Sequence, residues 1–247
     1  APTSAPRRSM GGLMQEDMAA PANAYLAWWD MAGVDCAIDE AAVNWLRPTA
    51  ISPSPLPAAA AEAKPATFEE FRIWLAQSPD QPERRWPGAP ILPEGQAKSP
   101  LMVITDMPDP ADMEAGSLLA DRAGRLFDAM LAAIGLSRDN ICLASLFSSR
   151  PPGGMVEAAD LSIAADRMRT LVSLATPDRL LIMGDRTIRT FLPVQDKAGM
   201  DNLHFFNHDG GIVPALATFH PRLLLGQPAA KAESWRTLQR LVEEMHK

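Results

Sequence analysis

The chain has 247 residues, 47% of them apolar, which suffices for one large domain or for a domain with an appendage. Its net charge of −7 argues against indiscriminate binding to nucleic acid, because phosphate contacts need clustered lysine and arginine. No apolar run reaches the length of a transmembrane helix, and residues 1–12 are not followed by the apolar core of a secretory signal, so we expect a cytoplasmic protein without a membrane partner.

The first hundred residues have an irregular texture. Residues 1–12 are expected to be a disordered or artificially added tail, and residues 13–100 a helical N-terminal extension with a proline-rich connection. The predicted helices cover residues 14–34, residues 40–46 and the stretch that follows Thr67, an N-cap residue type. The proline-rich segments are residues 47–65 and 78–100.

Residues 101–247 alternate short apolar runs with longer amphipathic segments, and we predict one α/β domain there. Continuous apolar runs of this length are typical of buried parallel strands. The four predicted strands are residues 101–104, 141–144, 179–184 and 212–217. The predicted helices are residues 118–135, 157–175, 185–191 and 228–246. The alternation implies right-handed βαβ units and a three-layer α/β/α sandwich with a four-stranded, mostly parallel sheet, in which residues 192–210 form an excursion.

Residue types that bind metals are few. Cys36 and Cys142 both lie in apolar patterns, and two cysteines cannot supply a four-ligand site, so buried free thiols are the better interpretation. His204 and His208 lie near Asp209, but without a defined scaffold such residues are more often surface polar groups. We therefore predict neither a metal site nor a cofactor.

The strongest functional signal is His220, which follows a predicted strand and precedes Pro221. Ligands of α/β proteins bind beyond the carboxyl ends of the strands, so we expect this histidine at the rim of a cleft, opposite residues 105–109. Taken alone, a histidine before a proline is more often structural, by roughly two to one. In the same way, Asp106 taken alone would be an ordinary turn residue.

Several blocks of sequence, in order, resemble one family. Residues 121–138 resemble the helix after the first motif of the family 4 uracil-DNA glycosylases, and Arg150-Pro151-Pro152-Gly153 resembles the loop after their second strand. A third block resembles their histidine motif and last helix; it comprises Thr218-Phe219-His220-Pro221 with Leu224, Leu225, Lys231 and Trp235. Residues 26–44 also resemble an extension found on some bacterial members.

The resemblance implies a uracil-DNA-glycosylase fold and cleavage of the bond between a base and its sugar in DNA. A glycosylase extrudes the nucleotide, and cleavage leaves a positively charged sugar and a negatively charged base. Asp106 stands where the family has the carboxylate that orients water and stabilises the sugar, and His220 stands where its histidine stabilises the leaving base. One preorganised donor of this kind contributes roughly 3 kcal/mol.

The motifs also depart from the family pattern. Thr105-Asp106-Met107-Pro108-Asp109 replaces Gly-Glu-Ala-Pro-Gly, so that Asp109 puts a charged side chain where the family brings backbone close to DNA. Leu119 replaces the phenylalanine that stacks on the base, and Ser145 replaces the asparagine that reads the uracil edge. The four cysteines of the family's iron–sulfur cluster are missing, with Ser149 at one of their positions. The departures imply a member without the cluster and with an altered base pocket.

The resemblance assigns further residues to the site. The implied pocket residues are Thr105, Met107, Pro108, Leu119 and Ser145. The implied DNA contacts are Arg150, Arg222, Leu223, Leu224 and Lys231. Residues 222–225 are expected to form a loop that enters the lesion site.

We therefore hypothesise a DNA glycosylase of weak or altered base specificity that acts as a monomer on single- or double-stranded DNA. A protein partner would bind through the N-terminal extension. One alternative is a catalytically silent member of the superfamily that serves as a nucleic-acid or protein interaction module, which the negative charge and Asp109 favour. A second alternative is hydrolysis of a nucleotide or nucleoside in the same pocket.

Overall fold

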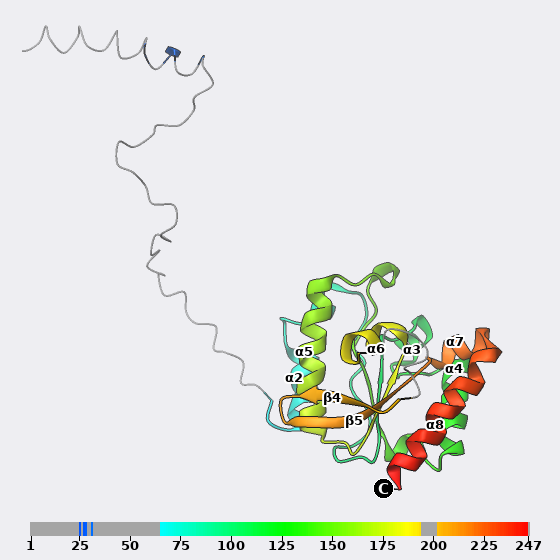
Figure 1. Cartoon of the computed structure of the whole chain (residues 1–247). Helices are drawn as coiled ribbons and strands as arrows, with labels where there is room; N and C mark the ends of the chain where they lie inside the picture. The colour runs from blue at the N-terminus through cyan, green and yellow to red at the C-terminus, as the bar shows by residue number, and fades with distance from the viewer. Residues whose placement is uncertain (1–24, 26, 29–30, 32–64, 194–201, 247) are drawn as a thin grey trace, which may run out of the picture. The chain divides into compact units, whose positions relative to one another are not determined.

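The structure is a computed structural model that describes residues 25, 27, 28, 31, 65–193 and 202–246 (Figure 1). The chain divides into two units, Ala1–Ala61 and Glu62–Lys247. In the first unit the described residues are helical, in agreement with the helix predicted over residues 14–34; they are Tyr25, Ala27, Trp28 and Met31. The predictions for residues 1–12, Cys36, residues 40–46 and most of residues 47–65 fall outside the described residues.

Helix α2 (Phe68–Gln77) begins where the sequence predicts a helix. The hydroxyl of Thr67 accepts a hydrogen bond from the backbone N–H of Glu70 (3.2 Å), which is the bond expected of an N-cap residue. The buried residues of α2 are Phe68, Phe71 and Leu75. These side chains anchor the helix to the core of the second unit.

A five-stranded sheet in the order β2-β1-β3-β5-β4 forms the centre of the second unit. Its strands are β1 (Met102–Thr105), β2 (Cys142–Ser145), β3 (Leu180–Met183), β4 (His204–His208) and β5 (Gly211–Thr218). The four strands predicted from apolar runs are confirmed, and they are parallel. The sequence does not predict β4, which lies in the excursion of residues 192–210 and pairs antiparallel with β5. The turn at Asp209-Gly210 favours this hairpin, because such pairs accommodate tight turns.

Helices cover both faces of the sheet, which confirms the predicted three-layer α/β/α sandwich (Figure 1). Successive residues of β1 point to opposite faces, so that Met102 and Ile104 belong to one core and Val103 to the other. The first core is completed by α2, α5 (Ala158–Ala175) and α6 (Asp185–Phe191). The second core is completed by α4 (Arg122–Ala133), α7 (Pro221–Gly226) and α8 (Lys231–Met245). None of the helices in the described part of the chain is both long and apolar enough to cross a membrane.

Short helical segments occupy two stretches where the sequence predicts no helix. Between the first strand and residue 118, where the sequence predicts no helix, lies α3 (Pro110–Ala115), which starts with a proline at its first position. Residues 222–225, predicted to be a loop, belong to α7. The short 3₁₀ turns are η1 (Pro82–Arg85), η2 (Arg138–Asn140), η3 (Pro152–Gly154) and η5 (Pro228–Ala230).

Helix α4 begins at Arg122 and not at residue 118, where the apolar pattern starts. The carboxylate of Asp121 caps the helix by accepting the N–H of Ala123 (2.8 Å). Leu119 has a φ of 54°, a left-handed conformation that an α-helix excludes. The apolar residues before Asp121 therefore pack into the core from a turn.

The outer edge of β2 is covered by the segment that precedes β1. The backbone N–H of Glu94 donates to the carbonyl of Leu143 (2.8 Å), and the N–H of Leu143 donates to the carbonyl of Glu94 (2.9 Å). Gly95 allows this approach, because its φ is +91° and a Cβ there would lie 2.0 Å from the carbonyl oxygen of Ile141.

Candidate functional site

A cleft of about 460 Å³ opens at the carboxyl edge of the parallel strands. Parallel strands end at the same edge of a sheet, so loops that are distant in sequence meet there. The lining residues are Asp106, Met107, Asp109, Arg150, Gly154, Gly184, Asp185, Arg186, His220 and Arg222. The cleft therefore brings together Asp106, which follows β1, and His220, which follows β5, the two residues on which the glycosylase hypothesis depends.

The carboxylate of Asp106 is paired with Arg186, a residue of α6. The Nη1 atom of Arg186 lies 3.0 Å from Oδ1 and 2.9 Å from Oδ2 of Asp106. Burial raises the pKa of Asp106, and the charge and hydrogen bonds of Arg186 oppose that rise. Sequence reasoning missed Arg186, although its position just after Gly184, where β3 ends at the same edge, was a usable signal.

A hydrogen bond from the backbone determines which ring nitrogen of neutral His220 carries the proton. Its Nδ1 accepts a hydrogen bond from the backbone N–H of Arg222 (3.2 Å), so the imidazole caps α7. A ring nitrogen that accepts a hydrogen bond carries no proton, which places the proton of the neutral ring on Nε2. Burial lowers the pKa of His220, and the positive charge of Arg222 lowers it further. The lowered pKa favours the neutral imidazole, in which the proton is on Nε2.

Asp109 forms ion pairs with two arginines that line the cleft. Its carboxylate forms ion pairs with Arg222 and, at 3.5 Å, with Arg150. The same side chain caps α3 in a capping box with Asp112, whose carboxylate accepts the N–H of Asp109 (3.0 Å). Arg222 also pairs with Asp121 at 3.2 Å. The two arginines expected to contact DNA are therefore each paired with an acidic side chain in this structure.

Of the residues implied to form the base pocket, Met107 lines the cleft and Pro108 is buried. Thr105 and Ser145 are register partners at the ends of β1 and β2, with 2% and 9% exposure. Their hydroxyls have no hydrogen-bond partner among the described residues. Leu119 is 3% exposed, packs in the second core and is not among the residues that line the cleft.

The remaining predicted DNA contacts lie in α7 and at the start of α8, and they differ in exposure. Leu223 is 38% exposed, whereas Leu224 is 2% exposed and packs in the second core. Lys231 is exposed at the first residue of α8. Leu223 and Lys231 are accessible, but Leu224 is a core residue, which corrects its assignment as a DNA contact.

The residues present do not fit the iron–sulfur cluster of the family 4 enzymes. Such clusters are held by cysteine thiolates. Cys142 is buried within β2, where burial raises the pKa of its thiol to about 12, and Cys36 lies outside the described residues. Ser149 is 1% exposed, and its hydroxyl has no partner in the described part of the chain. A serine and one inaccessible thiol cannot replace four thiolate ligands.

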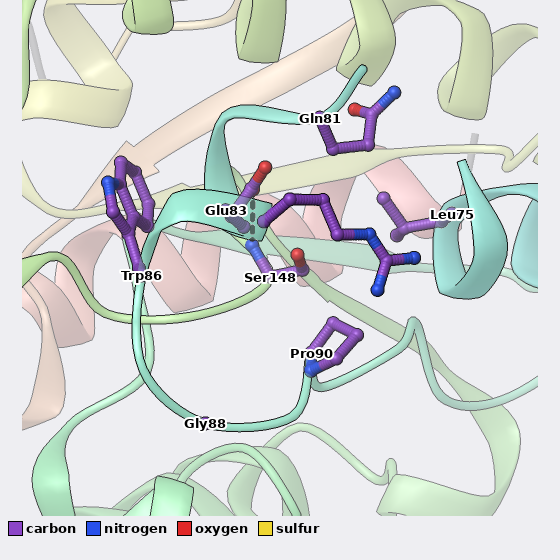
Figure 2. A pocket seen from close by; sticks show the side chains of 8 residues that line it. Leu75, Gln81, Glu83, Trp86, Gly88, Pro90 and Ser148 are labelled. Carbon is purple, nitrogen blue, oxygen red and sulfur yellow. Dashed lines mark hydrogen bonds between the residues drawn. The ribbon is translucent and has the colours of Figure 1, made fainter. Parts of the chain in front are cut away.

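A second, smaller pocket of about 90 Å³ lies where η1 meets the loop after β2 (Figure 2). Its lining residues are Leu75, Gln81, Glu83, Arg84, Trp86, Gly88, Pro90 and Ser148. The carboxylate of Glu83 accepts the backbone N–H of Ser148 (2.9 Å), the bond drawn in Figure 2. This bond ties η1 to the loop that carries Arg150.

A buried ion pair completes that connection. Arg167 of α5 donates to the two carboxylate oxygens of Glu83 at 2.6 and 2.9 Å, and to the carbonyl of Leu146 at 2.8 Å. The side chains of Arg167 and Glu83 are 5% and 3% exposed. Burial by itself would raise the pKa of Glu83, but the bonds and charge of Arg167 more than offset it, and the pKa lies below its usual range. The network joins η1, α5 and the loop after β2.

Comparisons with known proteins agree with this architecture. The model of the uracil DNA glycosylase superfamily matches residues 92–239. The chain is also 20% identical over 152 residues to the type-4 uracil-DNA glycosylase of Pyrobaculum aerophilum, an alignment that covers 59% of this chain and 78% of that protein. The region matched by the superfamily contains all five strands and both Asp106 and His220. The chain therefore belongs to the uracil DNA glycosylase superfamily.

Proposed function

We propose that this protein is a DNA glycosylase that hydrolyses the bond between deoxyribose and a deaminated base, flipped out of the strand, with weak or altered base specificity. The observation that carries the proposal is the presence of Asp106 and His220 in one cleft at the carboxyl edge of the sheet. Membership of the superfamily supports DNA as the ligand.

The reaction breaks the C1′–N bond, and the electron pair of that bond leaves with the base. The base becomes anionic, while the sugar passes through an oxocarbenium-like cation. Water then bonds to C1′, and the proton that it loses passes to the carboxylate of Asp106 and finally to the base anion or to solvent. The site must therefore stabilise one positive and one negative charge in a single cleft.

Asp106 supplies the negative charge for the sugar cation and the acceptor for the proton of water. Its pairing with Arg186 fixes the carboxylate at two distances near 3 Å and opposes the rise in pKa that burial causes. Arg186 therefore holds the carboxylate in a defined position and favours its ionised form.

His220 supplies the donor for the base. The bond from Arg222 to Nδ1 leaves the proton on Nε2, so a neutral N–H is preorganised toward developing negative charge. A lowered pKa suits this role, because the ring stays neutral before the base leaves.

The composition of the pocket supports altered specificity. Met107 lines the cleft, and the described lining residues include no phenylalanine, tyrosine or tryptophan; loss of an aromatic platform costs about 1–3 kcal/mol per base. Ser145 is 9% exposed at the end of β2 and is not among the residues that line the cleft, so it supplies no paired hydrogen bonds there, on which discrimination by a polar site depends. We expect weaker rejection of the wrong base than in a site that reads one base edge with paired bonds.

The proposal is tested with uracil-, hypoxanthine- and xanthine-containing oligonucleotides, single- and double-stranded, in a gel assay for strand cleavage at abasic sites. Asp106→Asn keeps the size of the side chain but removes its charge, and we expect the excision rate to fall by roughly a hundredfold or more. Asp166→Asn is the matched control, because Asp166 is an exposed residue of α5 with 74% of its side chain accessible. Absence of excision by the wild-type protein at high concentration, on every substrate, contradicts the proposal.

Arg186→Gln is expected to move the acid limb of the pH–rate profile to higher pH. Arg186 lowers the pKa of Asp106, so its removal lets burial raise that pKa further, and the active carboxylate is lost earlier as the pH falls. The wild-type limb itself should lie above pH 3.8, the ordinary value for aspartate. Arg189→Gln, on the same helix but paired with exposed Asp185, should leave the limb in place. An unmoved limb in Arg186→Gln would assign the acid limb to another group.

A second candidate, a catalytically silent interaction module, is supported by the ion pairs of the cleft. Arg150, Arg186 and Arg222 are each paired with a carboxylate. DNA binding without excision of any base in the same assay would favour this candidate.

A further inference from the structure

Arg150 and Arg222 converge on one carboxylate although they come from different parts of the fold. Arg150 lies in the loop after β2, Arg222 in α7, and Asp109 at the start of α3. Both arginines pair with Asp109, whose side chain is only 14% exposed, and all three residues line the cleft. Two guanidinium groups directed at one anion are the arrangement that binds a phosphate group.

We infer that Arg150 and Arg222 form a binding site for a backbone phosphodiester of DNA, and that the Asp109 carboxylate occupies this site as an internal competitor. The inference rests on the proposed function, because it takes DNA as the ligand of the cleft. Asp109 thus determines how tightly the protein binds the strand, independently of which base is recognised.

The charges of the cleft explain why a phosphate must displace Asp109. Arg186, the remaining arginine of the cleft lining, is held by Asp106. A phosphodiester that approaches Arg150 and Arg222 therefore meets a guanidinium pair that already has an anionic partner, and binding exchanges one set of charge-assisted hydrogen bonds for another. Such an exchange yields little net free energy, so the wild-type protein should bind undamaged DNA weakly.

The capping role of Asp109 does not require its charge. The start of α3 needs a side-chain acceptor, and asparagine and serine supply one about as well as aspartate. The charge is unfavourable at this position: burial raises the pKa of Asp109, an effect that Arg222 opposes and that the neighbouring Asp112 reinforces. A neutral cap would keep the helix and remove the Asp109 charge from both arginines, and Arg222 would keep its pair with Asp121 at 3.2 Å.

The test is binding of fluorescein-labelled oligothymidylate, which contains no damaged base, measured by anisotropy over a range of salt concentrations. Asp109→Asn should bind about tenfold more tightly than the wild-type protein at low salt, because Arg150 and Arg222 lose the carboxylate that they share and only Arg222 keeps another, Asp121. The plot of log K against log salt should steepen by roughly 0.7 to 1.4, the value for one or two additional phosphate contacts on a single strand. Asp109→Ser should show the same gain in affinity. It serves as a second test in case Asp109→Asn does not fold.

Two further variants separate this site from a general effect of charge. Asp185→Asn removes one negative charge from the same cleft, but Asp185 is 79% exposed and pairs with Arg189, so affinity should change by less than about threefold. In Asp109→Asn/Arg222→Gln the gain should largely disappear. An equal gain in Asp185→Asn, or no gain and no steeper salt dependence in both Asp109 variants, overturns the inference.

The result is independent of base excision. Tighter and more salt-dependent binding by Asp109→Asn, without excision of any base, supports the phosphate site and removes the glycosylase proposal. Excision by the wild-type protein without a gain in the Asp109 variants removes the phosphate site and leaves the glycosylase proposal intact.

Discussion

Arg167→Met is expected to lower the free energy of unfolding by about 3–5 kcal/mol, because it leaves the carboxylate of Glu83 buried without its charged partner. That carboxylate is 3% exposed and receives two hydrogen bonds from Arg167, so no solvent can replace them. The loss also removes the bond to the carbonyl of Leu146. Urea unfolding followed by circular dichroism measures the change.

Arg169→Met is the matched control, since it changes the same residue type on the same helix. Arg169 pairs with Asp166 at the surface, with 37% and 74% of their side chains exposed, and such pairs contribute less than about 1 kcal/mol. The double variant Glu83→Gln/Arg167→Met should recover part of the loss, because it removes the unpaired charge. Equal destabilisation by Arg167→Met and Arg169→Met would mean that the buried pair has no special role.

His220→Asn should reduce the excision rate by about 10²- to 10³-fold, the usual effect of removing one donor from a developing oxyanion. Asparagine can still accept the N–H of Arg222 and cap α7, so the loss isolates the Nε2–H of the imidazole from its structural role. Single-turnover rates on the best damaged oligonucleotide measure the effect.

Two additional measurements on His220→Asn separate chemistry from binding and folding. Its affinity for the damaged strand and its melting temperature should stay close to those of the wild-type protein, because the donor acts mainly as the bond breaks. An excision rate within a few-fold of the wild-type value would show that His220 does not stabilise the leaving base.

The parallel sheet could be predicted from sequence because each of its strands contains a short, mostly apolar run that is largely buried. Residues 180–183, for example, are all apolar and all buried. Strand β4 lacks this signal, because its sequence of His204, two phenylalanines, Asn207 and His208 reflects an edge strand exposed on one side. Helix α3 also gives no signal in the sequence, since its six residues are too few to show a periodic apolar face.

The residues of the candidate site could be predicted from sequence only in part. Residues that follow strands can be placed at one edge of the sheet, so His220 and residues 105–109 could be expected to meet there, and the family resemblance then singled out Asp106. Ion pairs between distant segments leave no local pattern, so the pairing of Arg186 with Asp106, and of Asp109 with Arg150 and Arg222, could not be inferred from spacing. Leu119 misled because its left-handed φ of 54° turns the chain into the core, and no propensity of leucine indicates such a conformation.

The contact between Glu94 and β2 has a consequence for how the protein behaves at high concentration. A parallel sheet that ends in an unpaired strand invites pairing with another copy, which leads to aggregation. The reciprocal bonds between Glu94 and Leu143 occupy the outward-facing amide and carbonyl of the edge strand. Because any side chain at Gly95 would collide with the carbonyl of Ile141, that one glycine lets the chain cover the β2 edge of the sheet at Leu143.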